Sequence, residues 1–123
     1  MARGIMINMT NEGLNRLLIK HFPHLMGRYL EEVSWQEGDS TGAHTVYGDV
    51  LTPYFVECIS ENDKKEIVSI LNFLEQILRL NDKYAEEVVA FSVLESTAYL
   101  FREQPILLTF LGETSRRVLS EIL

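Results

Sequence analysis

The spacing of the apolar residues constrains the fold of this chain more than any other feature. In residues 64–80, large apolar side chains recur at intervals of three and four, as they do on one face of an α-helix: Ile67, Ile70, Leu71, Leu74, Ile77 and Leu78. Similar runs lie on both sides, and no stretch alternates apolar and polar residues over the length of a strand. The sequence therefore predicts an all-α fold of about six or seven helices, in a compact bundle or a short stack of helix pairs.

Prolines and polar turns indicate where these helices end. The residue before a proline is driven out of the α conformation, so Phe22-Pro23 and Gln104-Pro105 are expected corners. Residues 36–42, with two glycines and no large apolar side chain, form the clearest loop. Thr52-Pro53 allows two interpretations. Either Thr52 caps a new helix that begins at Pro53, or one helix runs through this point and is kinked at the proline.

Two of the expected helices carry apolar residues that should pack inside the protein. The helix after Pro23 presents an apolar face at helical spacing, formed by Met26, Tyr29, Leu30 and Val33. The segment around 88–94 is apolar on nearly all sides, which predicts a central position, and Ile106 is expected to pack with the residues that follow it.

The length of 123 residues and 14.2 kDa suits a single domain over residues 1–123. The first ten residues show no helical pattern and are compatible with a disordered N-terminus. One cysteine cannot form an internal disulfide, no apolar run approaches the roughly 18 residues of a membrane span, and residues 1–10 lack the apolar stretch of a signal peptide. We therefore expect a cytoplasmic protein that does not bind membranes.

The charge is unevenly distributed along the chain. The net charge is −7, yet residues 1–28 hold four basic residues and one acidic residue. Residues 29–63 hold eight acidic residues and no lysine or arginine. Such an excess opposes binding to nucleic acid, which depends on neutralising phosphates. It favours a cationic protein partner, although a solvated surface, or lysines and arginines folded over the segment from elsewhere, would explain the same composition.

The acidic segment is also rich in aromatic residues, and aromatic anchors rimmed by charge of one sign are common in protein-binding surfaces. We therefore interpret it as a partner-binding face. The residues predicted to contact the partner are Glu31, Glu32, Trp35, Glu37, Asp39, Tyr47, Asp49 and Glu57.

Candidate catalytic or metal-binding residues are few. His21 and His24 have a spacing that metal ligands can use, but Pro23 lies between them and no cysteine or carboxylate is adjacent. His44, Asp49 and Cys58 supply the residue types of a nucleophilic site, but Cys58 falls on an apolar face, where a buried inert thiol is the ordinary finding. No phosphate-binding loop or zinc signature occurs in the sequence. We therefore predict neither an enzyme nor a bound metal or cofactor.

Several short patterns between residues 15 and 123 are shared with a known group of proteins. They are Phe22-Pro23, the stretch 44–50 with Gly48-Asp49, Phe73-Leu74-Glu75, and the stretch 89–95. In these patterns the chain resembles a group of small, acidic, all-helical bacterial proteins of uncharacterised type that includes candidate toxin-immunity proteins. The resemblance implies a cytosolic protein that binds and blocks a toxin domain, typically a basic nuclease. It implies no site residue.

Together these observations predict a non-enzymatic inhibitor of immunity type that binds a basic, nuclease-like toxin domain through an acidic face around residues 29–63. The alternative is a helical scaffold or adaptor that self-associates through an exposed apolar stripe within residues 105–123.

Overall fold

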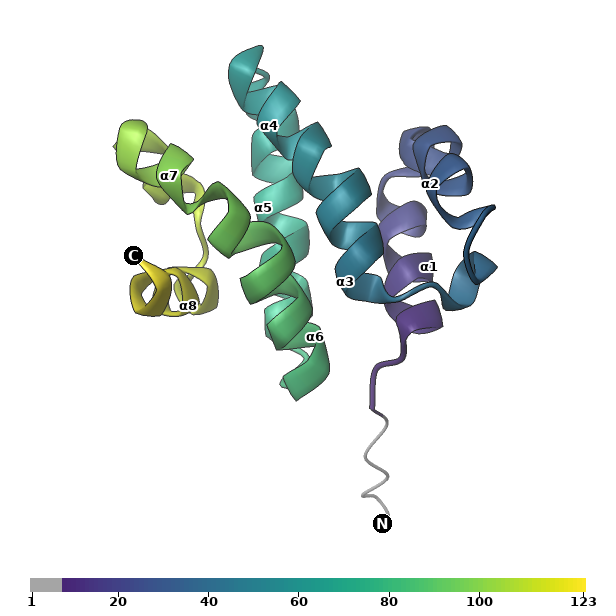
Figure 1. The fold of residues 1–123 in the computed structure, drawn as a ribbon. Coiled ribbons are helices and arrows are strands. Elements are labelled where there is room, and N and C mark those ends of the chain that lie inside the picture. Colours follow the sequence, from purple (N-terminus) through teal and green to yellow (C-terminus); the bar gives the residue numbers. More distant parts are fainter. Residues whose placement is uncertain (1–7) are drawn as a thin grey trace.

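The computed structural model describes residues 8–123 and is helical throughout, with no strand in that range (Figure 1). The all-α prediction is confirmed. The α-helices are α1 (Asn11–His21), α2 (Met26–Val33), α3 (Ala43–Val46), α4 (Thr52–Ser60), α5 (Lys64–Leu78), α6 (Lys83–Glu87), α7 (Glu95–Glu103) and α8 (Glu113–Ile122). Three segments are 3₁₀-helical, namely η1 (Pro23–Leu25), η2 (Gly38–Ser40) and η5 (Pro105–Phe110), and two are π-helical, η3 (Tyr47–Leu51) and η4 (Val88–Leu94).

The π-helical segments join short helices into two long ones. The segment η3 connects α3 to α4, and η4 connects α6 to α7, so that residues 43–60 and 83–103 each form one unbroken helix. The two π-helical segments pack against each other. Figure 1 shows α1 and α2 at one end of the molecule and α8 at the other, with α4, α5 and α6 between them.

Pro53 lies inside the first long helix, so the predicted helix start capped by Thr52 is wrong. The alternative interpretation, one helix that runs through this point, is correct in that residues 43–60 form a continuous helix. A proline inside a helix has no amide to donate and its ring crowds the carbonyl four residues earlier. Here the π-helical segment η3, which has a wider turn, ends two residues before Pro53 and includes Asp49, the residue whose carbonyl the ring would crowd. Thr52 instead donates its hydroxyl to the main-chain carbonyl of Ser92, at 2.7 Å.

The helix starts follow local capping signals. The side chains of Thr10, Asp63 and Asp82 accept main-chain amides at the starts of α1, α5 and α6. Asp82 also accepts the amide of Met9, at 2.9 Å. Met9 and Thr10, at the end of the segment expected to be disordered, thus both form hydrogen bonds, and residues 1–7 of that segment lie outside the described residues.

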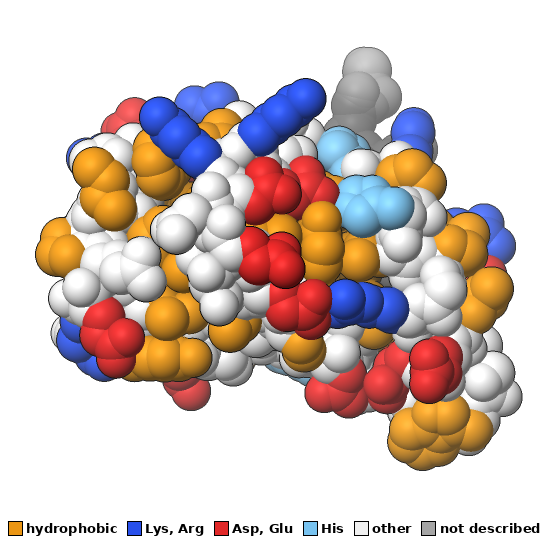
Figure 2. Space-filling model, turned by 90° about the horizontal axis from the view of Figure 1, so that it is seen from above, with side chains coloured by type: hydrophobic (Ala, Val, Ile, Leu, Met, Phe, Trp, Pro, Cys, Tyr) orange, Lys and Arg blue, Asp and Glu red, His pale blue; other side chains and the backbone are white. Residues whose placement is uncertain are grey.

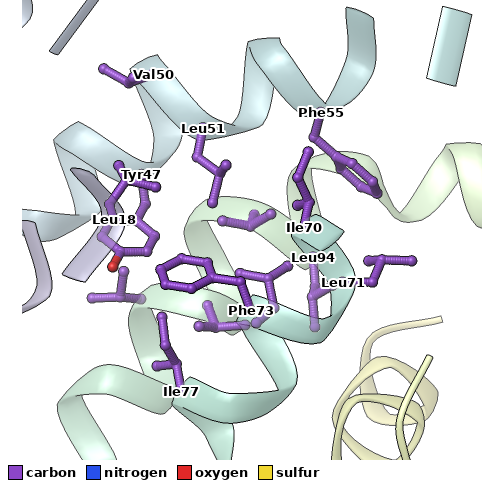
Figure 3. Packing of buried hydrophobic residues seen from close by; sticks show 14 of the residues in the cluster. Leu18, Tyr47, Val50, Leu51, Phe55, Ile70, Leu71, Phe73, Ile77 and Leu94 are labelled. Carbon is purple, nitrogen blue, oxygen red and sulfur yellow. The ribbon is translucent and has the colours of Figure 1, made fainter. Parts of the chain in front are cut away.

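The buried hydrophobic side chains form one cluster that draws on every α-helix (Figure 3). Tyr47 lies within it, fully buried beside Phe73, and its hydroxyl donates to the carbonyl of Leu14 at 2.6 Å. Burial raises the pKa of Tyr47 far above its ordinary value. The prediction that Tyr47 contacts a partner is therefore wrong, because its side chain does not reach the surface.

Some apolar residues that were expected to be packed are exposed. Tyr29 and Val33 of α2 are buried, but Met26 and Leu30 face solvent because no helix covers that side of α2. The segment η4 is central, as predicted, except for Phe91, which is exposed, and Ile106 is also exposed. The spacing of apolar residues predicts which face of a helix is apolar, but it does not predict how much of that face the neighbouring helices bury.

Candidate functional site

The eight carboxylates of residues 29–63 do not form one uniform negative surface. Figure 2 shows a row of acidic side chains across the middle of one face, with a Lys or Arg side chain against the row and histidine beside it. A smaller acidic group lies next to a protruding hydrophobic side chain at the lower right of the same view. The acidic side chains of this face therefore differ in what surrounds them.

Glu57 is held by an arginine from the basic beginning of the chain. The two terminal nitrogens of Arg28 donate to the two carboxylate oxygens of Glu57, at 2.9 and 2.8 Å. These hydrogen bonds lower the pKa of Glu57 and raise that of Arg28. The guanidinium also lies over the ring of Tyr54, 5.5 Å from its centre. Glu57 is exposed but already neutralised, so it does not offer a free negative charge to a partner.

A second cluster ties η1 to the start of α5. The Nε2 atom of His24 lies 2.9 Å from a carboxylate oxygen of Glu66 and 3.0 Å from the hydroxyl of Tyr54. Tyr54 donates to the same carboxylate at 2.5 Å. Cys58 lies one turn after Tyr54 on α4. Burial raises the pKa of its thiol, which makes the thiol a poor nucleophile.

Asp39 is occupied by contacts within its own end of the molecule. It accepts the hydroxyl of Tyr29 at 2.5 Å, and Arg16 lies 4.0 Å away. The main-chain carbonyls of Asp39 and Thr41 accept the buried amide of Asn15. These contacts fix residues 36–42 against α1, so the role of Asp39 in this structure is to hold the loop.

Two further carboxylates of this region, Glu31 and Glu37, lie on α2 and just beyond it. Trp35, just beyond the helix, is 73% exposed. Glu31 precedes it by one helical turn, Glu37 follows two residues later, and both are exposed. Met26 and Leu30, also one turn apart, add exposed apolar area. We call these five residues the α2 surface.

Neither acidic residue of the α2 surface forms an ion pair with any residue in the described range 8–123. Glu32 is only partly exposed and accepts the side-chain amide of Gln36 at 2.8 Å. Asp49 is exposed on η3, which packs against α2. Of the predicted contact residues, Glu31, Trp35 and Glu37 are thus exposed and lie close together in the sequence, at the end of α2 and just beyond it.

The residues proposed for nucleophilic chemistry are kept apart. His44 and Cys58 lie 14 positions apart on the unbroken helix of residues 43–60, which corresponds to about 20 Å along its axis. His44 instead lies 2.8 Å from the hydroxyl of Ser92, and Asp49 is exposed on η3.

The histidine pair likewise forms no metal site. The Nδ1 of His21 lies 3.1 Å from the carbonyl of Leu17, while His24 contacts Tyr54 and Glu66. Among the residues from 8 to 123, no cluster of three or more potential metal ligands occurs. None of the helices in this range combines the length and apolar character needed to cross a membrane.

The sequence of residues 15–123 matches a protein family described as "Domain of unknown function (DUF7674)". The chain belongs to this family. In this DUF7674 chain, the matched region contains the whole α2 surface and all helices from η1 to α8. No curated protein and no solved structure matches the chain.

One polar residue of this DUF7674 chain has a structural role that was not predicted from the sequence. Glu75 lies in the apolar stripe of α5, buried, and accepts the amide and hydroxyl of Ser115 at 2.8 and 2.7 Å and the amide of Thr114 at 3.2 Å. Burial raises the pKa of Glu75, but these hydrogen bonds together outweigh it and lower the pKa. Its carboxylate therefore fixes the start of α8. The sequence signal was a glutamate one turn after Leu71, on a buried face.

Proposed function

We propose that this chain is a non-enzymatic, protein-binding inhibitor, and that its α2 surface binds a cationic partner protein. The observation that carries the proposal is Trp35, a large aromatic side chain that is 73% exposed. In the sequence it lies between Glu31 and Glu37, neither of which forms an ion pair with a residue of the range 8–123. Exposed apolar patches rimmed by polar residues often mark protein-binding surfaces, and tryptophans that become buried on binding are frequent energetic centres of interfaces.

The two kinds of side chain on the α2 surface have different tasks in this proposal. Glu31 and Glu37 attract a basic partner and speed association, and their effect weakens with salt because exposed charges are screened within about 8 Å at physiological ionic strength. Trp35 and the exposed apolar side chains of Leu30 and Met26 become buried in the complex and slow dissociation.

The partner that suits this surface is a basic, nuclease-like toxin domain, which the chain would block as a cytoplasmic immunity protein. The net charge of −7 and the resemblance to small acidic immunity-type proteins support this role. A toxin that binds nucleic acid must carry a cationic surface, so an acidic inhibitor that covers this surface would prevent the toxin from binding its substrate.

The test compares three immobilised forms of the chain in an extract of the native host. The wild type is expected to retain a basic protein that elutes as salt rises. Glu31→Lys/Glu37→Lys should lose it. Glu103→Lys/Glu113→Lys, which changes the net charge equally at exposed positions on α7 and α8, should retain it. Equal retention by all three forms would contradict the proposal.

The retained protein is then assayed for nuclease or other toxic activity with increasing amounts of the chain. We expect the toxic activity to be fully inhibited at one chain per toxin domain. Retention without inhibition would leave a binding protein but remove the immunity role.

Self-association is the alternative function, and the exposure of Ile106 and Leu123 near the C-terminal end favours it. A light-scattering series over a hundredfold range of concentration separates the two. A constant monomer mass of 14.2 kDa is expected for the inhibitor. A stable dimer that Ile106→Ser dissociates would favour the scaffold.

A further inference from the structure

A groove of about 940 Å³ lies at the end of the molecule opposite α2. One wall is the long helix α6–η4–α7 and the other is α8. Its apolar lining consists of Ala90, Phe91, Ala98, Tyr99, Val118 and Ile122. The two alanines are buried and small, so they leave room for side chains that enter from outside.

Two aromatic side chains stand exposed at this groove. Phe91 is 53% exposed and Tyr99 is 46% exposed. They lie eight positions apart on one continuous helix, which is about two turns and therefore places them on the same side. The aliphatic side chains of this helix are buried, so Phe91 and Tyr99 form the part of its apolar surface that the rest of the protein leaves uncovered.

The charges around the groove are mainly acidic. Its lining includes Glu86, Glu87, Glu95 and Glu121, against Lys83 and Arg102. None of these six forms an ion pair with another residue of the range 8–123. An apolar strip with unpaired carboxylates along it is complementary to a segment that is apolar on one side and basic on its flanks.

We propose that this groove binds a basic amphipathic α-helix of a partner protein. From Lys83 to Arg102 the groove wall runs 19 positions along the helix, about 28 Å, which matches an α-helix of about 18 residues. The apolar face of that helix contacts Phe91 and Tyr99, and its lysines or arginines lie near Glu87, Glu95 and Glu121. The site is separate from the α2 surface and does not depend on the function proposed for it.

The probe is an 18-residue amidated peptide of leucine and lysine, with leucines on one helical face and a fluorescein label. Binding to the full chain is followed by fluorescence anisotropy. Phe91→Ala, an exposed position, should weaken binding about tenfold or more, the loss expected for an aromatic anchor. Glu95→Lys/Glu121→Lys should weaken it by a similar factor. Glu31→Lys/Glu37→Lys, with the same change in net charge, should bind within twofold of the wild type.

The single tryptophan of the chain supplies an internal control. Trp35 lies two residues after α2, which is at the other end of the molecule from α8, so the unlabelled leucine-lysine peptide should leave its emission unchanged. Circular dichroism verifies that each variant is folded. If Phe91→Ala does not fold, Tyr99→Ser is used in its place. A matched peptide with glutamate in place of lysine should not bind.

Four results would overturn the proposal. They are absence of peptide binding, equal affinity for the wild type and Phe91→Ala, a greater loss in Glu31→Lys/Glu37→Lys than in Glu95→Lys/Glu121→Lys, and a dimer of the free protein that Phe91→Ala dissociates. The last would show that a second copy of the chain covers the groove.

Discussion

The guanidinium of Arg28 and the carboxylate of Glu57 form a two-point ion pair, with nitrogen to oxygen distances of 2.9 and 2.8 Å. The two residues are 29 positions apart, and they join the basic beginning of the chain to its acidic middle. This pair neutralises one predicted contact residue. Within residues 29–63, it leaves the α2 surface as a place where an exposed aromatic residue and acidic side chains occur together without an ion pair to any residue of the range 8–123.

Replacing Arg28 with glutamine should raise the pKa of Glu57. Hydrogen bonds from Arg28 stabilise the charged form of the carboxyl group, so their removal makes protonation easier. The measurement is an NMR pH titration that follows the side-chain carboxyl carbon of Glu57 in both forms. An identical titration midpoint would show that the ion pair is not populated in solution.

Replacing Glu75 with glutamine should make stability less dependent on pH in the acid range. The folded-state pKa of Glu75 is lowered from its ordinary 4.5, so the folded protein holds fewer protons than the unfolded chain in this range. The stabilisation by the carboxylate is therefore present above about pH 4.5 and lost as the pH falls through the lower folded value. Urea denaturation between about pH 3 and pH 7 should give a free-energy difference between the two forms that shrinks on acidification. A constant difference would contradict this assignment.

Replacing Gly112 with alanine should destabilise the fold by about 1–3 kcal/mol, as overpacking usually does. An added Cβ atom at Gly112 would lie 2.4 Å from the side-chain carboxyl carbon of Glu75, which hydrogen bonds hold in place. Gly27→Ala is the matched control, because nothing lies within 4 Å of its added Cβ atom on exposed α2. That control should be neutral or stabilising. Equal unfolding midpoints for the two variants would contradict the packing described.

Replacing Thr52 with valine should cost about 0.5–1.5 kcal/mol, because the partly buried hydrogen bond from its hydroxyl to the carbonyl of Ser92 is lost. Thr52→Ser keeps the donor and should retain much of the stability. The midpoint of thermal unfolding is measured for the wild type and for the two variants. A serine variant as unstable as the valine variant would place the effect in packing and not in the hydrogen bond.

Local signals explain why much of the fold was predictable. The side chains of Thr10, Asp63 and Asp82 cap the helices that follow them. Pro23 ends α1 because the residue before a proline is driven out of the α conformation. Such effects act over three or four residues, so they are visible in the sequence. The π-helical turn before Pro53 was not predicted, because it depends on packing between η3 and η4, segments about 40 residues apart.

The candidate site was predicted only in part, for a similar reason. Tyr47 and Trp35 are both aromatic residues of the acidic segment, but Tyr47 lies one turn from Ala43 and Leu51 on a buried face. Trp35 lies one turn from Glu31 and precedes a polar loop, so it has no apolar neighbours at helical spacing. The pairing of Arg28 with Glu57 is a tertiary contact that composition cannot show.

The most direct test of the α2 surface uses the single tryptophan of the chain, replaced by 5-fluorotryptophan. The fluorine NMR signal of Trp35 is recorded while the basic protein retained from the host extract is added. We expect the signal to shift and to lose its sensitivity to D₂O as the side chain becomes buried, and Glu31→Lys/Glu37→Lys should weaken this response. An unchanged, solvent-sensitive signal at saturating partner would contradict the proposal.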